Sequence, residues 1–356
     1  MRAKVSGTIT GLTGSITLIL SSCTVLCGLS AEVHAEEPRL AWQIQRIAMP
    51  ERPLHIVPGG TLTTLQDIII EAESGAWYRL ADCGEGLCAQ LFTGVHTERH
   101  LPPGALPGSE VAEGANRIAR AWLADPAQRF EASAIGANIA GTLIVEDRTG
   151  RNFRLETALD EGFEDRRVHI EDIDGNGIDT LFAVKSSQDQ GAALVAVRLE
   201  AEGLLRIAAS TAPVGHPNGW LNVIGAADFT GAGHKAVALV RTPGPDGQLQ
   251  ILDCPGDQFA LLFAVPGVNN FSPATTALDM AVIADFDGDG LADIAVPDAT
   301  RQAIRILSFR GGQVAEPSVI ALPAPVATEI AAITAAPGKR PLLLMGLENG
   351  ELVLLH

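Results

Sequence analysis

The sequence predicts an all-β chain made of repeated units of four short strands, and two observations point to it. Gly (37 residues) and Pro (21 residues) are spread along the 356-residue chain, as is typical of many short strands joined by turns. One phrase also returns four times: an apolar strand, a turn rich in Asp and Gly, and a second apolar strand. The clear turns begin at Asp172, Asp228 and Asp285, which gives steps of 56 and 57 residues.

Each repeat continues with a hairpin after its Asp/Gly turn. Residues 301–308 and 314–322 alternate around the turn Gly311-Gly312 in the clearest copy. A repeat of four strands with this period is near the length of one propeller blade. The sequence therefore predicts a single β-propeller of four-stranded blades, with six blades preferred and seven as the alternative. The parsed blades are 54–98, 113–165, 168–213, 221–268, 278–322 and 328–356 plus 40–50. The least regular part is 100–165, where 115–123 is compatible with a short helix.

The two chain ends predict how the last blade is completed. Residues 45–50 resemble 318–323, the outer strand of a blade, while the final unit stops at 351–355 without such a strand. We expect the N-terminal strand to complete the last blade, because an unpaired sheet edge is a site for aggregation.

The turn at 285–293 carries the sharpest chemical signal. Carboxylates at its positions 1, 3, 5 and 9 and the carbonyl of position 7 can converge on one point, and glycines permit the tight backbone. An all-oxygen ligand set suits a hard cation and favours Ca²⁺ over Mg²⁺. An EF-hand is excluded because position 12 is Val296 inside a strand. The predicted ligands are Asp285, Asp287, Asp289, Leu291 and Asp293.

The other turns retain this ligand set to different degrees. The turn at 172 keeps three of the side-chain positions, and we expect a weaker calcium site there, with Asp179 as a compensating acid. The predicted weaker ligands are Asp172, Asp174, Asn176, Ile178 and Thr180. The turn at Asp228 keeps only its first acid, so we expect it to have lost the ion. An Asp/Gly turn that binds nothing is the alternative for every copy.

These turns resemble the FG-GAP/VCBS repeat of integrin-α-like β-propellers, as found in exported bacterial proteins. The resemblance is clearest over 165–325 and extends towards both ends of the mature chain. It implies Ca²⁺ in the loops between the first two strands of a blade, on one face of the disc. The eroded turns at 228 and 334 and the absence of the Phe-Gly and Gly-Ala-Pro signature are departures from the family pattern.

The N-terminus predicts export. A basic start, an apolar stretch from Ile16 to Leu29 and the site Val33-His34-Ala35 are typical of a signal peptide covering 1–35, with 36–356 as the mature propeller. The alternatives are a membrane anchor and lipidation of Cys23, which ends a lipobox-like Leu20-Ser-Ser-Cys. We therefore expect a periplasmic or extracellular protein with no transmembrane span in the mature chain.

Cysteine usage agrees with an oxidising compartment. Cys83 and Cys88 bracket a short loop and are expected to form a disulfide, with two free thiols as the alternative. Cys254 is left over and is expected to be a small buried residue.

Charge and motifs narrow the function. A net charge of −17 disfavours nucleic acid and anionic membranes as partners. The histidines of 96–100 suit a solvated loop better than a zinc site, and 216–222 is either a recognition surface or a segment with a buried Trp220.

No catalytic motif is present, so we expect a monomeric binding module for a protein or glycan on one face. The alternatives are a channel enzyme, which requires acids or histidines from several blades to converge, and a structural envelope lipoprotein. The sequence shows no such convergent set.

Overall fold

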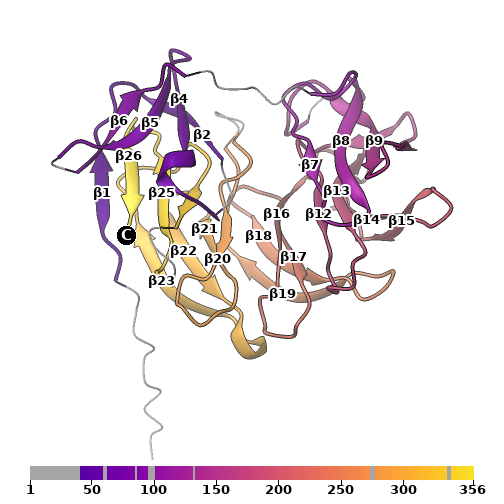
Figure 1. The fold of residues 1–356 in the computed structure, drawn as a ribbon. Helices are drawn as coiled ribbons and strands as arrows, with labels where there is room; N and C mark the ends of the chain where they lie inside the picture. Colours follow the sequence, from indigo (N-terminus) through magenta and orange to yellow (C-terminus); the bar gives the residue numbers. More distant parts are fainter. Residues whose placement is uncertain are drawn as a thin grey trace, which may run out of the picture. The chain divides into compact units, whose positions relative to one another are not determined.

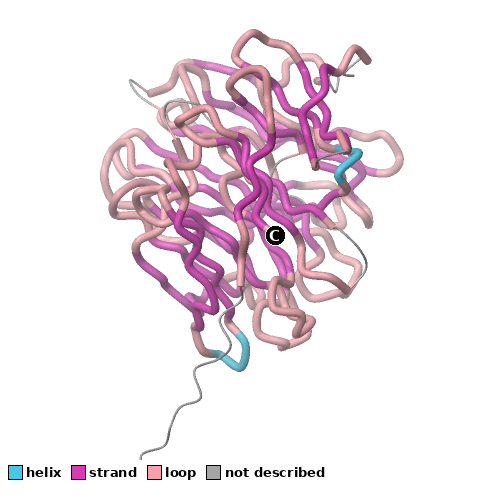
Figure 2. The backbone as a smooth tube through the Cα atoms, turned by 90° about the vertical axis from the view of Figure 1, so that its left-hand side faces the viewer, coloured by secondary structure: helices cyan, strands magenta, loops and turns pink. Residues whose placement is uncertain are grey.

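The computed structural model describes residues 41–58, 62–84, 86–94, 101–130, 133–272, 277–334 and 338–356. The predicted signal peptide at 1–35, Cys23 and the histidines of 96–100 lie outside the described residues. Within these ranges every regular element is a strand except two short 3₁₀ turns, η1 (Leu65–Asp67) and η2 (Arg310–Gly312) (Figure 2). None of the described segments is a helix long and apolar enough to cross a bilayer.

The described strands form six four-stranded antiparallel arrays at the predicted positions, and the chain is a β-propeller (Figure 1). Two of the arrays share one nine-stranded sheet because β11 (Glu161–Phe163) pairs with both β9 and β13. Blade 1 contains β2 (Pro53–Val57), β4 (Ile69–Ala72), β5 (Trp77–Asp82) and β6 (Leu87–Leu91); blade 2 contains β7 (Ala112–Glu113), β8 (Ile118–Ala127), β9 (Ile139–Asp147) and β10 (Asn152–Glu156); blade 3 contains β12 (His169–Glu171), β13 (Thr180–Ser187), β14 (Gly191–Leu199) and β15 (Leu205–Ser210). Blade 4 contains β16 (Leu221–Ala227), β17 (Ala236–Arg241), β18 (Gln248–Asp253) and β19 (Ala260–Pro266); blade 5 contains β20 (Val282–Ala284), β21 (Asp293–Pro297), β22 (Ala303–Ser308) and β23 (Ala315–Ala321); blade 6 contains β24 (Ala331–Ile333), β25 (Leu342–Gly346), β26 (Leu352–Leu355) and β1 (Ile44–Ile47).

Blade 6 is completed by the N-terminal strand, as predicted. Strand β1 lies beside β26 (Figure 1) and pairs with it in the antiparallel sense. The register places Ile44 opposite Leu355 and Ile47 opposite Leu352. The short β3 (Leu62–Thr63) lies parallel to β24 on the other edge of the same sheet. Both edges of this sheet are therefore covered by residues from the N-terminal part of the chain.

The core lies between neighbouring blades. Apolar clusters join blades 2, 3 and 4, blades 4 and 5, blades 5 and 6, and blades 6 and 1. Among the described residues none of these clusters joins blade 1 to blade 2. Middle strands such as β14 are buried on both faces, which explains their continuous runs of Ala, Val and Leu.

The short helix considered at 115–123 is wrong, because residues 118–123 belong to strand β8 and 115–117 form the bend before it. Ala121, Trp122, Leu123 and Ala124 are all buried and pair with β9. Pairing on a buried sheet outweighs the moderate helix propensity of this Ala-rich segment.

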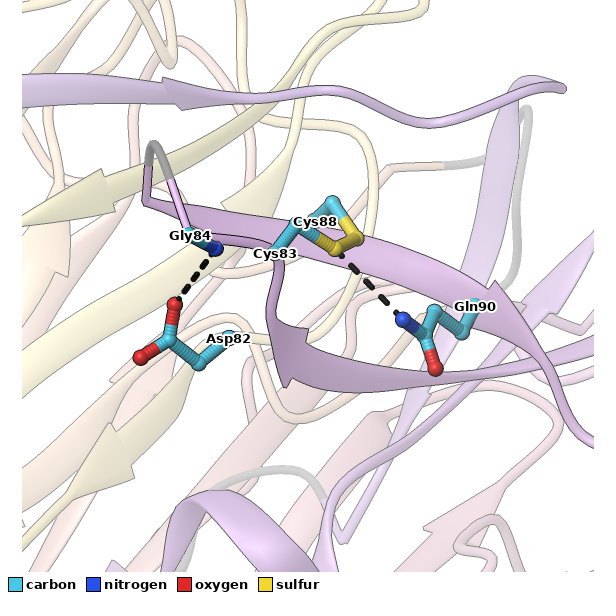
Figure 3. The surroundings of a disulfide bond; sticks show 5 residues. All are labelled: Asp82, Cys83, Gly84, Cys88 and Gln90. Carbon is cyan, nitrogen blue, oxygen red and sulfur yellow. Dashed lines mark hydrogen bonds between the residues drawn. A yellow bond between two sulfur atoms is a disulfide. The ribbon is translucent and has the colours of Figure 1, made fainter.

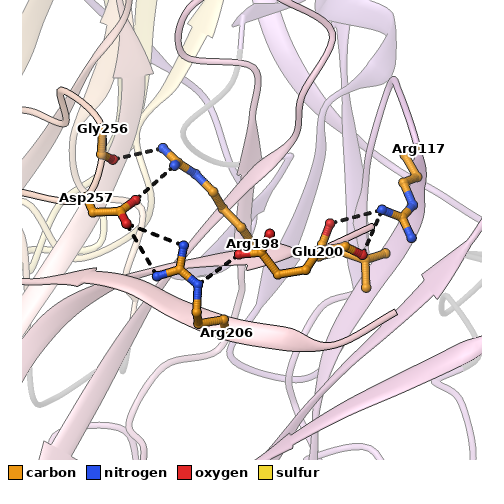
Figure 4. A network of polar contacts seen from close by, with 7 residues as sticks. Arg117, Arg198, Glu200, Arg206, Gly256 and Asp257 are labelled. Atoms are coloured by element: carbon orange, nitrogen blue, oxygen red, sulfur yellow. Dashed lines mark hydrogen bonds and ion pairs between the residues drawn. The ribbon is translucent and has the colours of Figure 1, made fainter. Parts of the chain in front are cut away.

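Polar contacts join blades 2, 3 and 4 near their outer strands (Figure 4). Arg198 donates to Gly256 O (2.9 Å) and to Asp257 Oδ1 (3.1 Å), which ties β14 to the β18–β19 turn. Arg117 donates to Leu199 O and Glu200 O at 3.0 Å, which ties blade 2 to the same region. These groups are partly exposed, so each contact adds little stability by itself.

Replacing Ile47 by Ala tests the importance of the N-terminal strand. Ile47 is 4% exposed and Ile44 is 40% exposed in the same strand. We expect Ile47→Ala to lower the free energy of unfolding by about 2 to 4 kcal/mol, because it opens a cavity between blades 6 and 1. The matched change Ile44→Ala should cost less than about 1 kcal/mol. Equal and small effects in urea denaturation would show that β1 does not support the fold.

Candidate functional site

The acidic loop, residues 285–293, connects β20 to β21 in blade 5. Gly288 (φ 82°) and Gly290 (φ 85°) adopt left-handed backbone conformations that favour glycine. Phe286 is fully buried and anchors the loop to the core. The loop is therefore a tight turn that is anchored to the core by Phe286 and that carries the predicted carboxylate ligands.

Three of the predicted ligands converge. Oxygens of Asp285, Asp287 and Asp289 lie within 4.8 Å of one another, the one such acidic group found in the described part of the chain. Asp285 accepts hydrogen bonds from Gly288 N (2.7 Å) and Gly290 N (2.9 Å), which fixes its carboxylate across the loop. Leu291 is half-buried, and its N–H donates to Asp289 Oδ1 at 2.8 Å.

Asp293 lies beside this group in the core rather than within it. Its side chain is 0% exposed, and Oδ2 accepts from Phe286 N at 2.9 Å. Oδ1 of Asp293 and Oδ2 of Asp289 have no hydrogen-bond partner, and the nearest cation to the latter is Arg310 Nη1 at 3.6 Å. Burial, followed by repulsion from Asp287 and Asp289, raises the pKa of Asp293 to about 7 despite hydrogen bonds from Phe286 N and the Ser308 side chain. Buried acceptors without donors fit a site that takes a cation.

The loop at 172–180 presents fewer oxygens. Asp172 accepts from Asn176 N (3.0 Å) and Gly177 N (2.8 Å), and Asn176 Oδ1 accepts from Ile178 N at 2.9 Å. Asp174 is exposed, and Thr180 is buried at the start of β13.

The expected compensation by Asp179 is wrong. Its two carboxylate oxygens accept from Asn116 Nδ2 (3.0 Å) and Ile118 N (2.9 Å), so the side chain is bound to blade 2. Asp179 stands in the loop directly before β13, one residue short of the position that Asp293 holds at the start of β21, and its carboxylate is directed to blade 2 instead.

The loop at 228 is closed by its own backbone. Asp228 accepts from four N–H groups, those of Thr230, Gly231, Ala232 and Gly233. Burial raises the pKa of Asp228, but these hydrogen bonds outweigh it and the pKa is lowered. This loop keeps its shape without a second carboxylate.

The three loops are hydrogen-bonded to one another. Lys235 N donates to Ile173 O at 2.9 Å, and Ala292 N donates to Asp228 O at 3.3 Å. They therefore lie side by side on one face, at the same end of the inner strands of blades 3, 4 and 5.

A second charged group, missed by the sequence analysis, lies where inner strands begin. This inner-strand cluster contains His55, Glu110, Asp165, Arg167, Asp279 and Glu329, from blades 1, 2, 3, 5 and 6. Arg167 donates to Asp279 Oδ1 (2.7 Å) and Oδ2 (3.3 Å) and lies 3.6 Å from Glu110. Glu329 accepts from Ile56 N at 2.9 Å and contacts His55 Nδ1 at 3.0 Å.

Burial perturbs these acids. Asp165 is 6% exposed, and burial raises its pKa to about 6, although hydrogen bonds from Arg167 N and Arg166 N oppose the shift. Burial also raises the pKa of Asp279 in spite of Arg167. The hydrogen bond to Glu329 raises the pKa of His55.

The repeats themselves contained a signal for part of this cluster. Asp279 and Asn222 each stand six residues before the first acid of their turn. Asn222 Nδ2 donates to Leu278 O (2.7 Å) and Asn270 O (3.3 Å), so it also joins two blades at this level. Comparing the copies at this offset would have revealed a polar position in otherwise apolar inner strands.

The remaining predicted residues have clear positions. Cys83 and Cys88 form a disulfide at the turn of the β5–β6 hairpin, where Gly84 N donates to Asp82 Oδ1 at 2.9 Å (Figure 3). Cys254 is a free buried thiol whose pKa is raised by burial to about 11. Trp220 is buried, donates to Glu164 O and packs edge-on against Phe271, so it is a core residue.

Comparison with solved structures gives distant similarities. The WD40 domain of Toxoplasma gondii coronin is 11% identical with a TM-score of 0.48 over 88% of this chain and 85% of that chain. Soluble aldose sugar dehydrogenase from Escherichia coli is 13% identical with a TM-score of 0.42 over 89% and 99%. The Photorhabdus luminescens Tc holotoxin pore is 12% identical with a TM-score of 0.37 over 88% and 14%. No protein-family model and no curated protein matches the sequence.

Replacing Asp165 by Asn tests whether the buried charge of Asp165 lowers the stability of the protein. The folded pKa of about 6 lies above the unfolded value, so stability contributed by protonation is present at low pH and is lost as pH rises through 6. Asn keeps the acceptor for the two N–H groups and removes the charge. We expect Asp165→Asn to stabilise the protein by about 1 to 3 kcal/mol at pH 8 and by little at pH 4. A destabilised variant at pH 8 in urea denaturation contradicts this view.

Proposed function

We propose that this chain is an exported calcium-binding β-propeller that acts as an interaction module for a protein or glycan. The observation that carries the metal assignment is the acidic loop, where three carboxylates converge beside the buried Asp293, whose Oδ1 has no hydrogen-bond partner. Asp285, Asp287, Asp289 and Asp293, with the Leu291 carbonyl, are the proposed ligands. The resemblance of the repeat to FG-GAP/VCBS propellers supports the same assignment.

The chemistry of the donor set favours Ca²⁺. All the ligands are oxygens, and an irregular cage of carboxylates and a carbonyl suits Ca²⁺ better than the strict octahedron of Mg²⁺. The ion supplies positive charge to acids that otherwise repel one another. It thereby stiffens the loop, and through the Ala292–Asp228 hydrogen bond it supports the neighbouring loop as well.

The proposed sites differ in strength. The loop at 172–180 offers two carboxylates and one amide, fewer charged ligands than the four carboxylates of the acidic loop, and Thr180 stands where the acidic loop has Asp293. The loop at 228 offers one carboxylate with four such bonds and is proposed to hold no ion.

A binding role fits the rest of the molecule better than catalysis. A channel enzyme requires acids or histidines from several blades to converge, and the inner-strand cluster brings such residues together. Its groups, however, are largely engaged: Asp279 holds Arg167, and both oxygens of Glu329 have partners. Among the described groups of the cluster, Asp165 Oδ2 is the one buried carboxylate oxygen without a partner, and a single free oxygen does not supply a general acid and a general base. We therefore propose a non-enzymatic monomer that is exported in soluble form. The alternative is an exported protein anchored to a membrane by a lipid on Cys23.

Calcium titration tests the metal assignment. With Ca²⁺ at about a hundredfold its Kd we expect about 2.7 kcal/mol of stabilisation and a rise in Tm of roughly 5 °C. Asp287→Asn and Asp293→Asn should abolish the rise, whereas Asp174→Asn in the loop at 172–180 should change it little.

The control is Asp246→Asn, which removes an exposed carboxylate from the β17–β18 turn and should leave the calcium effect unchanged. In chelator, Asp293→Asn should be at least as stable as the native protein, because it removes a buried charge. An unchanged calcium response in Asp293→Asn, or none in the native protein, would sink the assignment.

Partner capture tests the interaction role. The immobilised mature protein should retain a specific envelope protein or glycan in Ca²⁺ and release it in chelator. The double variant Asp287→Asn/Asp293→Asn should fail to retain it even in Ca²⁺, because its loop is not stiffened. If the double variant retains the partner as well as the native protein does, binding of the partner does not depend on the acidic loop.

A further inference from the structure

The inner-strand cluster holds more negative than positive charge. Four carboxylates, those of Glu110, Asp165, Asp279 and Glu329, face the guanidinium of Arg167 and the imidazole of His55, whose pKa is raised by its hydrogen bond to Glu329. The guanidinium of Arg166 donates hydrogen bonds to the carbonyl oxygens of Pro107 and Ile135 and does not pair with these carboxylates. Asp279, Glu329 and Glu110 are 19%, 14% and 55% exposed, so solvent and small solutes reach the cluster.

Buried acceptors at the cluster point to a missing donor. Asp165 Oδ2 has no hydrogen-bond partner and belongs to a side chain that feels the charges of both Arg167 and Asp279. Asn270 is 1% exposed, and its Oδ1 also has no partner. Asn222 ties the backbone of Asn270 to that of Leu278, next to Asp279. Unpaired buried acceptors are costly, and a ligand that carries N–H groups satisfies them.

The spacing of the carboxylates disfavours a metal ion. Among the described residues, only the acidic loop brings three acidic side chains within 4.8 Å of one another. The cluster also contains Arg167, whose guanidinium would repel a divalent ion about twice as strongly as a monovalent cation at the same distance. An organic cation whose N–H groups donate to several acceptors suits separated carboxylates, as Arg167 itself shows by lying between Asp279 and Glu110.

We propose that the inner-strand cluster binds a primary alkylammonium group. The ammonium donates to the unpartnered Oδ2 of Asp165 and offsets the carboxylate charge that Arg167 and His55 leave uncompensated. The group comes either from a free diamine or polyamine or from a lysine side chain of a partner. This site is separate from the proposed calcium site and does not depend on it.

The ligand enters from the face opposite to the acidic loop. Strand β20 lies between Asp279 at one end and Asp285 at the other. Six residues of extended chain span roughly 20 Å. The two charged sites therefore occupy opposite ends of the same inner strands, and one is testable without the other.

Isothermal titration calorimetry of the full mature chain in chelator, with n-butylammonium, putrescine and spermidine as probes, tests the proposal. We expect saturable binding that Glu110→Gln weakens about five- to tenfold, because it removes an exposed carboxylate that contacts Arg167 without touching the core. Asp165→Asn should also weaken binding, although it is expected to stabilise the fold. Asp293→Asn should bind like the native protein, which separates this site from the calcium site.

The control for net charge is Glu202→Gln, which removes one exposed carboxylate from the β14–β15 turn. Equal weakening in Glu202→Gln and Glu110→Gln, or no saturable heat with any probe, overturns the proposal. Spermidine binding at least tenfold tighter than N-acetyl-lysinamide supports the site with a free polyamine as its ligand. Comparable binding of N-acetyl-lysinamide and butylammonium supports it with a partner lysine as the source.

Discussion

The antiparallel pairing of β1 with β26 is the constraint on which the rest of this propeller depends. It places residues 44–47 and 352–355 in one sheet, so the two ends of the chain hold blade 6 together. Blade 6 in turn packs against blade 1 through a shared apolar cluster, and Glu329 reaches His55 and Ile56 N. Without this pairing β26 would be an exposed edge, and the inner strands that present both charged sites would lose their support on one side.

The inner strands separate two groups of carboxylates that the fold does not fully neutralise. In the acidic loop the carboxylates of Asp287, Asp289 and Asp293 lie close together; in the inner-strand cluster four carboxylates share Arg167 and His55, and Asp165 Oδ2 has no partner. Uncompensated buried charge destabilises a protein unless a ligand or a proton offsets it. The contrast with Asp228, where four N–H groups satisfy one carboxylate, shows that this chain can build the same turn without such a cost. The proposed ligands of the two sites would offset this charge.

Much of the fold and part of the candidate site could be predicted, and the failures have physical reasons. The strand–turn–strand copies around Asp172, Asp228 and Asp285 are local patterns, and the blades lie where these patterns place them. Strand β8 was ambiguous because Ala-rich segments suit a helix or a buried strand until a neighbouring strand is known. Asp179 was misjudged because its partners, Asn116 and Ile118, come from the preceding blade. Asp293 stands at the expected position, but only packing shows that it is fully buried.

The sequence by itself determined the repeat, the shape of the acidic loop and the strand that completes blade 6. Each of these follows from residues close together in the chain, or from the similarity of one segment to another. Only the tertiary structure decided that Arg167 meets Asp279, 112 positions away, and that acids from separate blades form one cluster. Such contacts depend on how successive blades are placed around the inner strands. That placement arises from packing across the whole fold, and no local pattern of residues encodes it.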